Sequence, residues 1–104
     1  MGVHRITSEA AKYYAVRERI LGSGITLLGA ASEKIGELDK STAEKLGDLA
    51  SYLLPHSPGY AGKLMAVTAR LFWAVAGVRE KDWEFKELDE IEKEIEDIKS
   101  KVES

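Results

Sequence analysis

A small residue recurs at every seventh position from residue 15 to residue 50. The full set is Ala15, Gly22, Gly29, Gly36, Ala43 and Ala50. Because seven residues make about two turns of an α-helix, these positions share one face if the segment is helical. An apolar side chain directly precedes each of the three glycines, namely Leu21, Leu28 and Ile35. The pattern predicts a helix with a stripe of small residues, bordered by apolar side chains, on which a second helix can pack closely.

The rest of the chain also carries helix signals and not strand signals. No segment alternates apolar and polar residues over more than a few positions, as a half-buried strand would. With 104 residues, of which 44% are hydrophobic, the chain can bury one modest core. We therefore predict an all-α protein, a small helical bundle that forms a single domain over residues 1–104.

The first predicted helix is long and covers residues 8–38. Thr7 or Ser8 can cap the free amide groups at its start. Gly22-Ser23-Gly24 opposes helix formation inside this range, because two glycines cost about 2 kcal/mol relative to alanine. The apolar pairs on either side of these glycines nevertheless keep the seven-residue register. We therefore predict one continuous helix, with or without a kink.

A second helix is predicted over residues 41–54. It can begin with a capping box, in which Ser41 and Glu44 each cap the other's amide group. The register of small residues also continues into this range. One uninterrupted helix that reaches Leu54 is therefore the alternative.

The segment Pro55-His56-Ser57-Pro58 forces a break, and a third helix is predicted over residues 58–78. Ser57 is placed to cap this helix and Gly77 to end it. Both of its sides are apolar, which predicts a central position in the bundle. One apolar face, at four-three spacing, comprises Tyr60, Leu64, Val67, Leu71, Ala74 and Val78, and the opposite side carries Met65, Phe72, Trp73 and Ala76.

A last helix, capped by Asp82, is predicted over residues 83–103. Its apolar residues follow spacings of three and four and form a heptad seam, which comprises Leu88, Ile91, Ile95, Ile98 and Val102. About two heptads are too few for a stable isolated coiled coil. The seam therefore needs a partner helix, from this chain or from a second copy.

The C-terminal part of the chain is acidic. Residues 80–104 contain eleven Asp or Glu and five Lys or Arg, whereas residues 1–79 contain seven and ten. A solvent-exposed face on the last helix explains these carboxylates, and the alternative explanation is an acidic arm for a basic partner.

The residue types exclude most catalytic and cofactor chemistry. The chain has no cysteine, and neither His4 nor His56 has a second metal ligand at helical spacing. Neither Gly22-Ser23-Gly24 nor Gly62-Lys63 satisfies the spacing of a nucleotide-binding loop. The acidic C-terminal part lacks the turn of a calcium loop. We expect no catalytic, cofactor-binding or metal-binding residues, and hence no enzyme.

The composition indicates a cytoplasmic protein from a thermophile. The chain contains no asparagine and no glutamine, while charged residues make up 32% of it, a bias typical of proteins that work at high temperature. Its N-terminal residues lack the apolar core of a signal peptide. The longest uncharged stretch has 14 residues, fewer than the roughly 20 that a membrane-spanning helix needs. We therefore expect no membrane partner.

These patterns favour a non-catalytic assembly or accessory subunit that binds a second copy of itself or another helical protein. The predicted partner-binding residues are Gly22, Gly29, Gly36, Leu88, Ile91, Ile95, Ile98 and Val102. The same two stripes can equally form the core of a single chain.

Two alternative functions follow from other features of the chain. The first is a nucleic-acid-associated protein, in which an acidic C-terminal helix tunes an affinity that basic residues provide. Those basic residues are Lys12, Arg17, Arg19, Lys63 and Arg70. The second is a small enzyme whose site lies at an interface between subunits.

Overall fold

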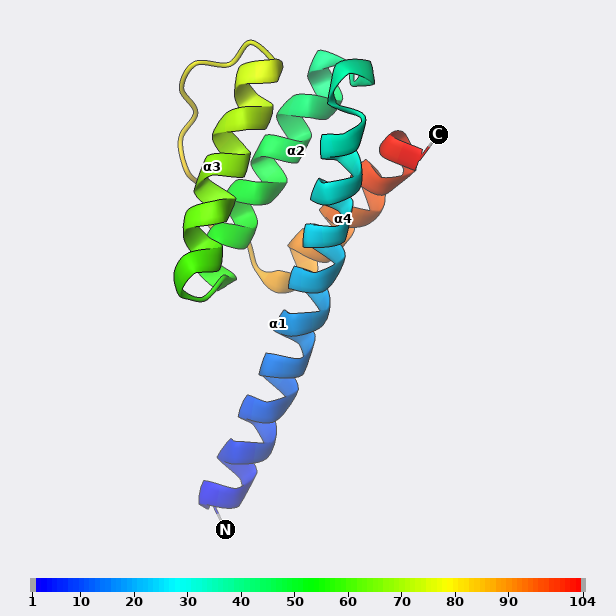
Figure 1. The fold of residues 1–104 in the computed structure, drawn as a ribbon. Coiled ribbons are helices and arrows are strands. Elements are labelled where there is room, and N and C mark those ends of the chain that lie inside the picture. Colours follow the sequence, from blue (N-terminus) through cyan, green and yellow to red (C-terminus); the bar gives the residue numbers. More distant parts are fainter. Residues whose placement is uncertain (1, 104) are drawn as a thin grey trace.

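The computed structural model describes residues 2–103 and shows an all-helical protein (Figure 1). These residues form four α-helices and two 3₁₀ turns, with no strand among them. The elements are α1 (Gly2–Glu33), η1 (Ile35–Glu37), α2 (Lys40–Leu53), η2 (Leu54–His56), α3 (Gly59–Val75) and α4 (Leu88–Glu103). The molecule measures 54 × 28 × 20 Å. The predicted fold class, an all-α helical bundle, is confirmed.

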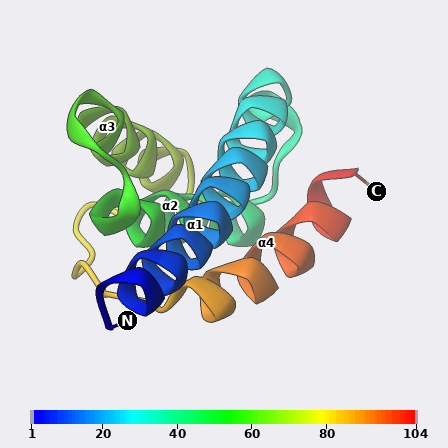
Figure 2. The ribbon, with the colours of Figure 1, turned by 90° about the horizontal axis from the view of Figure 1, so that it is seen from below.

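α2 is the central helix of the bundle. α3 packs on it from one side, and α1 and α4 contact it from the other and also contact each other (Figure 2). The side chains of α2 that are completely buried are Ala43, Leu46, Leu49, Ala50 and Leu53. The prediction that residues 58–78 form the central helix is therefore wrong. Short connections place consecutive helices side by side, so the second of the first three helices becomes the middle one.

α1 runs without interruption through Gly22-Ser23-Gly24, as the apolar register predicted. At Gly24 it lies close to α2, because a Cβ atom there would stand 2.5 Å from Cδ1 of the fully buried Leu53. Contact with α2 thus offsets the weak helix propensity of this glycine. α1 begins at Gly2, so the predicted start at residue 8 and a cap by Thr7 or Ser8 are wrong.

The N-terminal part of α1 projects beyond the other helices (Figure 1). Buried side chains of α1 begin at Ile20 and continue to Ala31. We call residues 2–19 the α1 arm; side chains are described from residue 8 onward. Between residues 8 and 19, no side chain of the arm is buried in the core that the structure describes.

A short connection separates α1 from α2. α1 ends at Glu33, so the predicted end at residue 38 and the uninterrupted helix to Leu54 are both wrong. Asp39 is the N-cap of α2, and its side chain accepts a 2.8 Å hydrogen bond from the amide of Thr42. Hydrogen bonding from the side chain of Thr42, and secondly from its amide, lowers the pKa of Asp39, because both favour the charged carboxylate. The predicted cap, Ser41, lies inside the helix because Asp39 already serves the first free amides.

α3 begins after the predicted break at residues 55–58 and ends before Gly77 as predicted, but the predicted cap by Ser57 is wrong. Ser57 donates its hydroxyl to the carbonyl of Leu53 at 2.8 Å and does not cap α3. Gly77 has a φ of +80°, and the amide of Val78 donates to the carbonyl of Trp73 at 2.8 Å. Gly77 therefore ends the helix in the left-handed conformation that favours glycine.

Residues 78–87 form an extended connection, so the predicted helix start at Asp82 is wrong. Trp83 meets Trp73 of α3 edge to face, with ring centroids 5.2 Å apart, and Phe85 lies 5.3 Å from the ring of His56. Residues two apart point in nearly opposite directions on a helix but share one side of an extended segment. These two contacts therefore favour the extended conformation, and α4 begins only at Leu88.

Candidate interaction surfaces

The predicted heptad seam of α4 lies in the core of the chain. Its five residues are between 0% and 8% exposed. They pack against α1 and α2 and belong to the same cluster of buried side chains as the apolar residues of α1, α2 and α3. The seam therefore finds its partner helices within one chain and offers no surface to a second protein. Its members are Leu88, Ile91, Ile95, Ile98 and Val102.

The predicted stripe of glycines lies on the surface of the molecule. A Cβ atom added at Gly22, Gly29 or Gly36 would meet no atom within 4 Å. The two glycines that do mark close helix packing are Gly24 and Gly47, and neither belongs to the seven-residue register. A Cβ atom at Gly47 would run into the indole ring of Trp73, 2.5 Å from its Nε1. No helix of this chain therefore packs on the predicted stripe, and its contact with a second copy stays a prediction.

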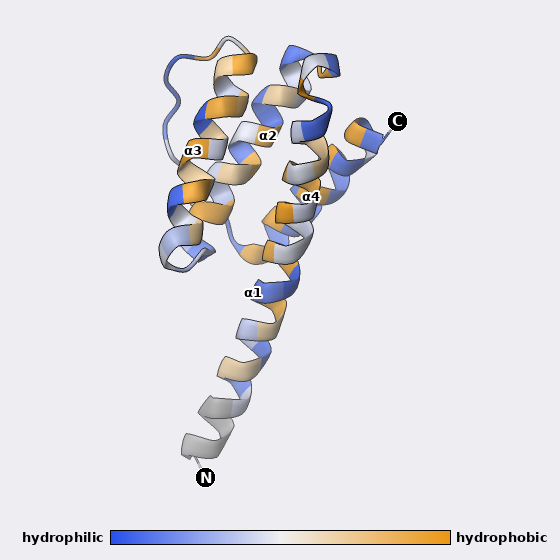
Figure 3. Ribbon diagram, viewed as in Figure 1, coloured by the Kyte–Doolittle hydropathy of each residue, from blue (hydrophilic) through white to orange (hydrophobic). Residues whose placement is uncertain are grey.

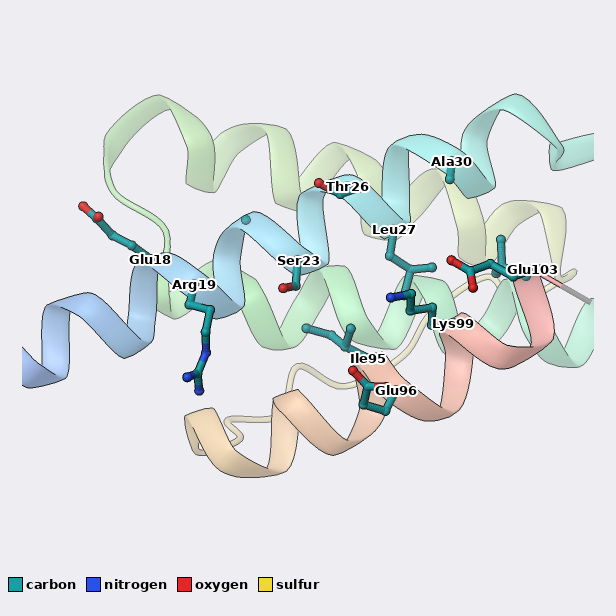
Figure 4. A pocket seen from close by; sticks show the side chains of 12 residues that line it. Glu18, Arg19, Ser23, Thr26, Leu27, Ala30, Ile95, Glu96, Lys99 and Glu103 are labelled. Carbon is teal, nitrogen blue, oxygen red and sulfur yellow. The ribbon is translucent and has the colours of Figure 1, made fainter.

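A surface hollow of about 450 Å³ lies between α1 and α4 (Figure 4). Gly22 lines it together with two seam residues, Ile95 and Val102, whereas Gly29 and Gly36 do not. Of its larger apolar lining residues, Leu27, Ile95 and Val102 are at most 5% exposed, whereas the small Ala30 is exposed. Charged residues of both signs surround it, namely Glu18, Arg19, Glu96, Lys99 and Glu103. The hollow thus offers little apolar area to a ligand.

Among the described residues, the longest row of exposed large apolar side chains follows one side of α3, a helix that carries many apolar residues (Figure 3). Five side chains at helical spacing are exposed there: Tyr60 at 71%, Leu64 at 48%, Val67 at 61%, Leu71 at 48% and Val75 at 37%. We call these five residues the α3 outer face. The opposite side of the helix, with Met65, Ala69, Phe72 and Trp73, is buried against α2. Contiguous exposed apolar residues are typical of an interaction site.

The charged residues of α3 itself are both positive, whereas Glu80 and Asp82 of the following connection line a surface hollow together with Arg70. No Asp or Glu occurs in residues 49–79, and the charged residues in this range are Lys63, Arg70 and Arg79. The guanidinium of Arg70 lies 5.8 Å from the ring centroid of Trp83, above the connection to α4. The outer face is therefore apolar with cationic borders, in contrast to the acidic exposed side of α4.

The α1 arm carries a second uncovered apolar surface. Tyr13, Tyr14 and Val16 are 49%, 51% and 37% exposed, and the two tyrosine rings meet edge to face at 5.7 Å. The guanidinium of Arg17 lies 4.9 Å from the ring centroid of Tyr14. Its Nε atom is shielded from solvent and has no hydrogen-bond partner among the described residues. Buried hydrogen-bond donors are normally paired. Arg17 Nε, at the base of the arm, therefore lacks the hydrogen bond expected of a buried donor among the described residues.

A polar cluster fastens residues 78–87 to α2. Lys81 pairs with Glu44 at 2.6 Å and Asp48 at 2.7 Å, and the indole of Trp73 donates to Asp48 at 3.0 Å. Burial opposes the charge of Lys81, but hydrogen bonds and attraction from the two carboxylates outweigh it and raise the pKa of Lys81. Burial, with the charge of Asp48 second, raises the pKa of the nearby Tyr52 to about 12. These shifts belong to a structural anchor between α2, α3 and the connection.

The residues considered for catalysis have structural contacts. His56 is 6% exposed, and its Nε2 donates to the carbonyl of Lys86 at 3.0 Å. Ser57 bonds to Leu53 and not to His56. No group of three or more His, Asp or Glu side chains that could hold a metal ion occurs in the described part of the chain. None of the helices between residues 2 and 103 combines the length and apolarity that crossing a bilayer requires.

Reasoning from sequence missed both uncovered surfaces. It identified the apolar positions of residues 60–78 but assigned them to the interior of the bundle. The absence of carboxylates from residues 49–79 was the available signal that this region differs from the rest of the surface. The seven-residue pattern selects the glycines that face solvent and leaves out Gly24 and Gly47, where helices touch.

Comparison with known proteins identifies a close relative. No known protein family and no solved structure matches the chain. An uncharacterized protein of Archaeoglobus fulgidus is 65% identical over 102 residues, which cover 98% of this chain and 94% of the relative. At this identity over nearly the whole length of both proteins, the chain belongs to the same family as this archaeal protein.

Proposed function

We propose that this chain is a non-catalytic assembly subunit that binds a second copy of itself through the α3 outer face. The observation that carries the proposal is the row of five exposed apolar side chains on α3, from Tyr60 to Val75. A helix with one side in the core and the other side apolar and uncovered is suited to pack against a second helix. The cationic borders, Lys63 and Arg70, keep the face soluble and leave its centre apolar.

Burial of this face is expected to favour association. Each of these large side chains is roughly half covered already, so covering the rest contributes on the order of 1 kcal/mol per residue. Part of that gain is offset by the lost freedom of two molecules on association. A change at the centre of the face, at Val67, should therefore weaken the dimer measurably.

The contacts of the candidate reactive residues also favour a non-catalytic role. His56 and Ser57 both bond to backbone carbonyls, and both hold the turn between α2 and α3. The alternative of nucleic-acid binding has less support, because three of its five basic residues are engaged within the chain. Arg19 pairs with Glu92 at 2.9 Å, Arg17 stacks on Tyr14, and Arg70 lies over Trp83.

Sedimentation velocity of the full chain over a range of concentrations tests the proposal. The wild-type protein is expected to reach twice the mass of one chain. Val67→Glu is expected to raise the dissociation constant of the dimer at least tenfold, or about 1.4 kcal/mol, because it places a carboxylate in the apolar contact. Ser41→Glu is the matched control, since it adds the same charge at an exposed position in the first turn of α2.

Circular dichroism of each variant establishes that it is folded. A wild-type protein that stays monomeric at every concentration contradicts the proposal, as does equal association of Val67→Glu and Ser41→Glu. Salt-dependent binding of the wild-type protein to duplex or single-stranded nucleic acid at about 50 mM salt would instead support the alternative function.

A further inference from the structure

We infer that the α1 arm of one copy lies along the α3 outer face of the second copy, and that the second copy returns the same contact. This inference rests on the proposed function, because it names the segment that covers the α3 outer face. It makes the dimer a reciprocal exchange of arms and not a pairing of two α3 helices.

The arm carries three large apolar side chains, Tyr13, Tyr14 and Val16, that the described part of the chain leaves exposed. Tyr13 lies seven residues before the buried Ile20, which lies seven residues before the buried Leu27, so these three apolar side chains share one side of α1. Short isolated helices are marginally stable in water. A helix that projects with two half-exposed tyrosines therefore gains stability from a partner that covers it.

The dimensions of the arm and of α3 match. The arm contains the 18 residues from position 2 to position 19 and is about 27 Å long at roughly 1.5 Å per residue. α3 contains 17 residues and is about 25 Å long by the same measure. An arm laid along α3 can therefore contact the outer face from Tyr60 to Val75.

An exposed apolar side chain of α1, Ile25, also lies outside the arm. α1 stands between α3 and α4 when the molecule is seen end-on (Figure 2). On α1, Ile25 lies about 200° around the helix from Ser23, which lines the hollow against α4. Ile25 is 48% exposed and thus lies on the side of α1 away from α4. Ile25 thus adds to the exposed apolar area of α1 outside its contact with α4.

Charge and symmetry favour arm exchange over pairing of two α3 helices. Two α3 outer faces pressed together would bring Lys63 and Arg70 of both copies together, with no carboxylate from residues 49–79 to offset them. The arm contains four Lys or Arg and two Glu, so it is less uniformly basic than a second α3 outer face. An exchange in which each copy gives its arm to the other and accepts the other's arm is a closed two-fold dimer, in which both apolar surfaces are covered.

Disulfide trapping tests the inference, because the natural chain has no cysteine. Tyr14→Cys in the arm and Leu64→Cys on α3 are made in separate full-length chains, which are produced together and oxidised. The mixed disulfide is expected to exceed either self-disulfide by roughly tenfold, since thiols held within one complex meet at millimolar effective concentration. Ala10→Cys with Tyr60→Cys is a second pair that allows for a shifted register. Ser100→Cys, on the exposed side of α4, is the control partner for Leu64→Cys.

The possible outcomes separate the inference from the proposed function. A dominant self-disulfide of Leu64→Cys would show pairing of two α3 helices, which overturns arm exchange and keeps self-association. A dimer in sedimentation with no mixed disulfide from either pair also overturns arm exchange alone. A wild-type chain that is monomeric in sedimentation at all concentrations contradicts both.

Discussion

α3 and α4 both carry apolar residues at spacings of three and four, but only α4 buries that pattern. The seam of α4 is at most 8% exposed, whereas the α3 outer face is between 37% and 71% exposed. α4 has one apolar side on an otherwise charged helix, so a single arrangement covers it. α3 is apolar on both sides and can turn only one of them toward α2. Periodicity thus predicts which residues share a side of a helix, and the number of neighbouring helices decides which side is covered.

The largest effect is expected when a side chain of each helix is shortened to alanine and the two losses of stability are compared. Ile91→Ala, in the seam, is expected to lower the free energy of unfolding by about 2–5 kcal/mol, because Ile91 is fully buried. Leu64→Ala, on the α3 outer face, is expected to cost less than about 1 kcal/mol at concentrations where the chain is monomeric. Urea unfolding measures both. Equal losses in the free energy of unfolding of the two variants in dilute protein would contradict this difference between the helices, because they would mean that the α3 outer face is covered within the monomer.

Alanine substitutions of glycine compare the buried inner side of α3, which Gly47 contacts, with a solvent-exposed position at Gly29 of α1. Gly47→Ala is expected to destabilise the protein by about 1–3 kcal/mol, because the new methyl group meets the 5% exposed ring of Trp73. Gly29→Ala is expected to stabilise it by up to about 1 kcal/mol, since the position is helical and open to solvent. Thermal unfolding of dilute protein measures both changes. A loss of stability in Gly29→Ala would instead indicate that a partner packs on the glycine stripe.

The smallest expected effect tests the anchor that holds the connection between the two helices. Tyr52 ionises near pH 10 in the unfolded chain but has a pKa of about 12 in the folded protein. The stability that the raised pKa of Tyr52 contributes to the folded protein is therefore fully present below pH 10 and is lost as the pH rises from 10 toward 12. We expect Tyr52→Phe to reduce the fall in stability between about pH 9 and about pH 11 by on the order of 1 kcal/mol, after allowance for solvent screening.

Urea midpoints of the wild type and of Tyr52→Phe at the two pH values provide the measurement. Lys81 contributes in the same direction, because its raised pKa gives stability that is present below pH 10.5 and lost above the folded-state value. Lys81→Met is therefore the companion variant. An unchanged alkaline slope in Tyr52→Phe would contradict the assigned burial of this side chain.

Much of the fold was accessible from the sequence, and less of the candidate site was. The continuity of α1 through Gly22-Ser23-Gly24 followed from the apolar register. The stop at Gly77 followed from the conformational freedom of glycine. The conformation of residues 78–87 was not accessible, because it depends on Trp73 and His56, which meet Trp83 and Phe85 only after folding. The exposure of Tyr60 and its neighbours likewise depends on how many helices surround α3.

The sequence by itself determined that this protein is helical, where proline and glycine interrupt its helices, and which residues share each helix face. These properties depend on local spacing, on proline and glycine, and on polar caps, all of which act within a few residues. Only the tertiary structure decided that α2 is central, that the α4 seam is core, and that the glycine stripe, the α1 arm and the α3 outer face lie on the surface. Burial depends on which helices become neighbours, and one chain of four helices cannot cover every apolar face that its sequence provides.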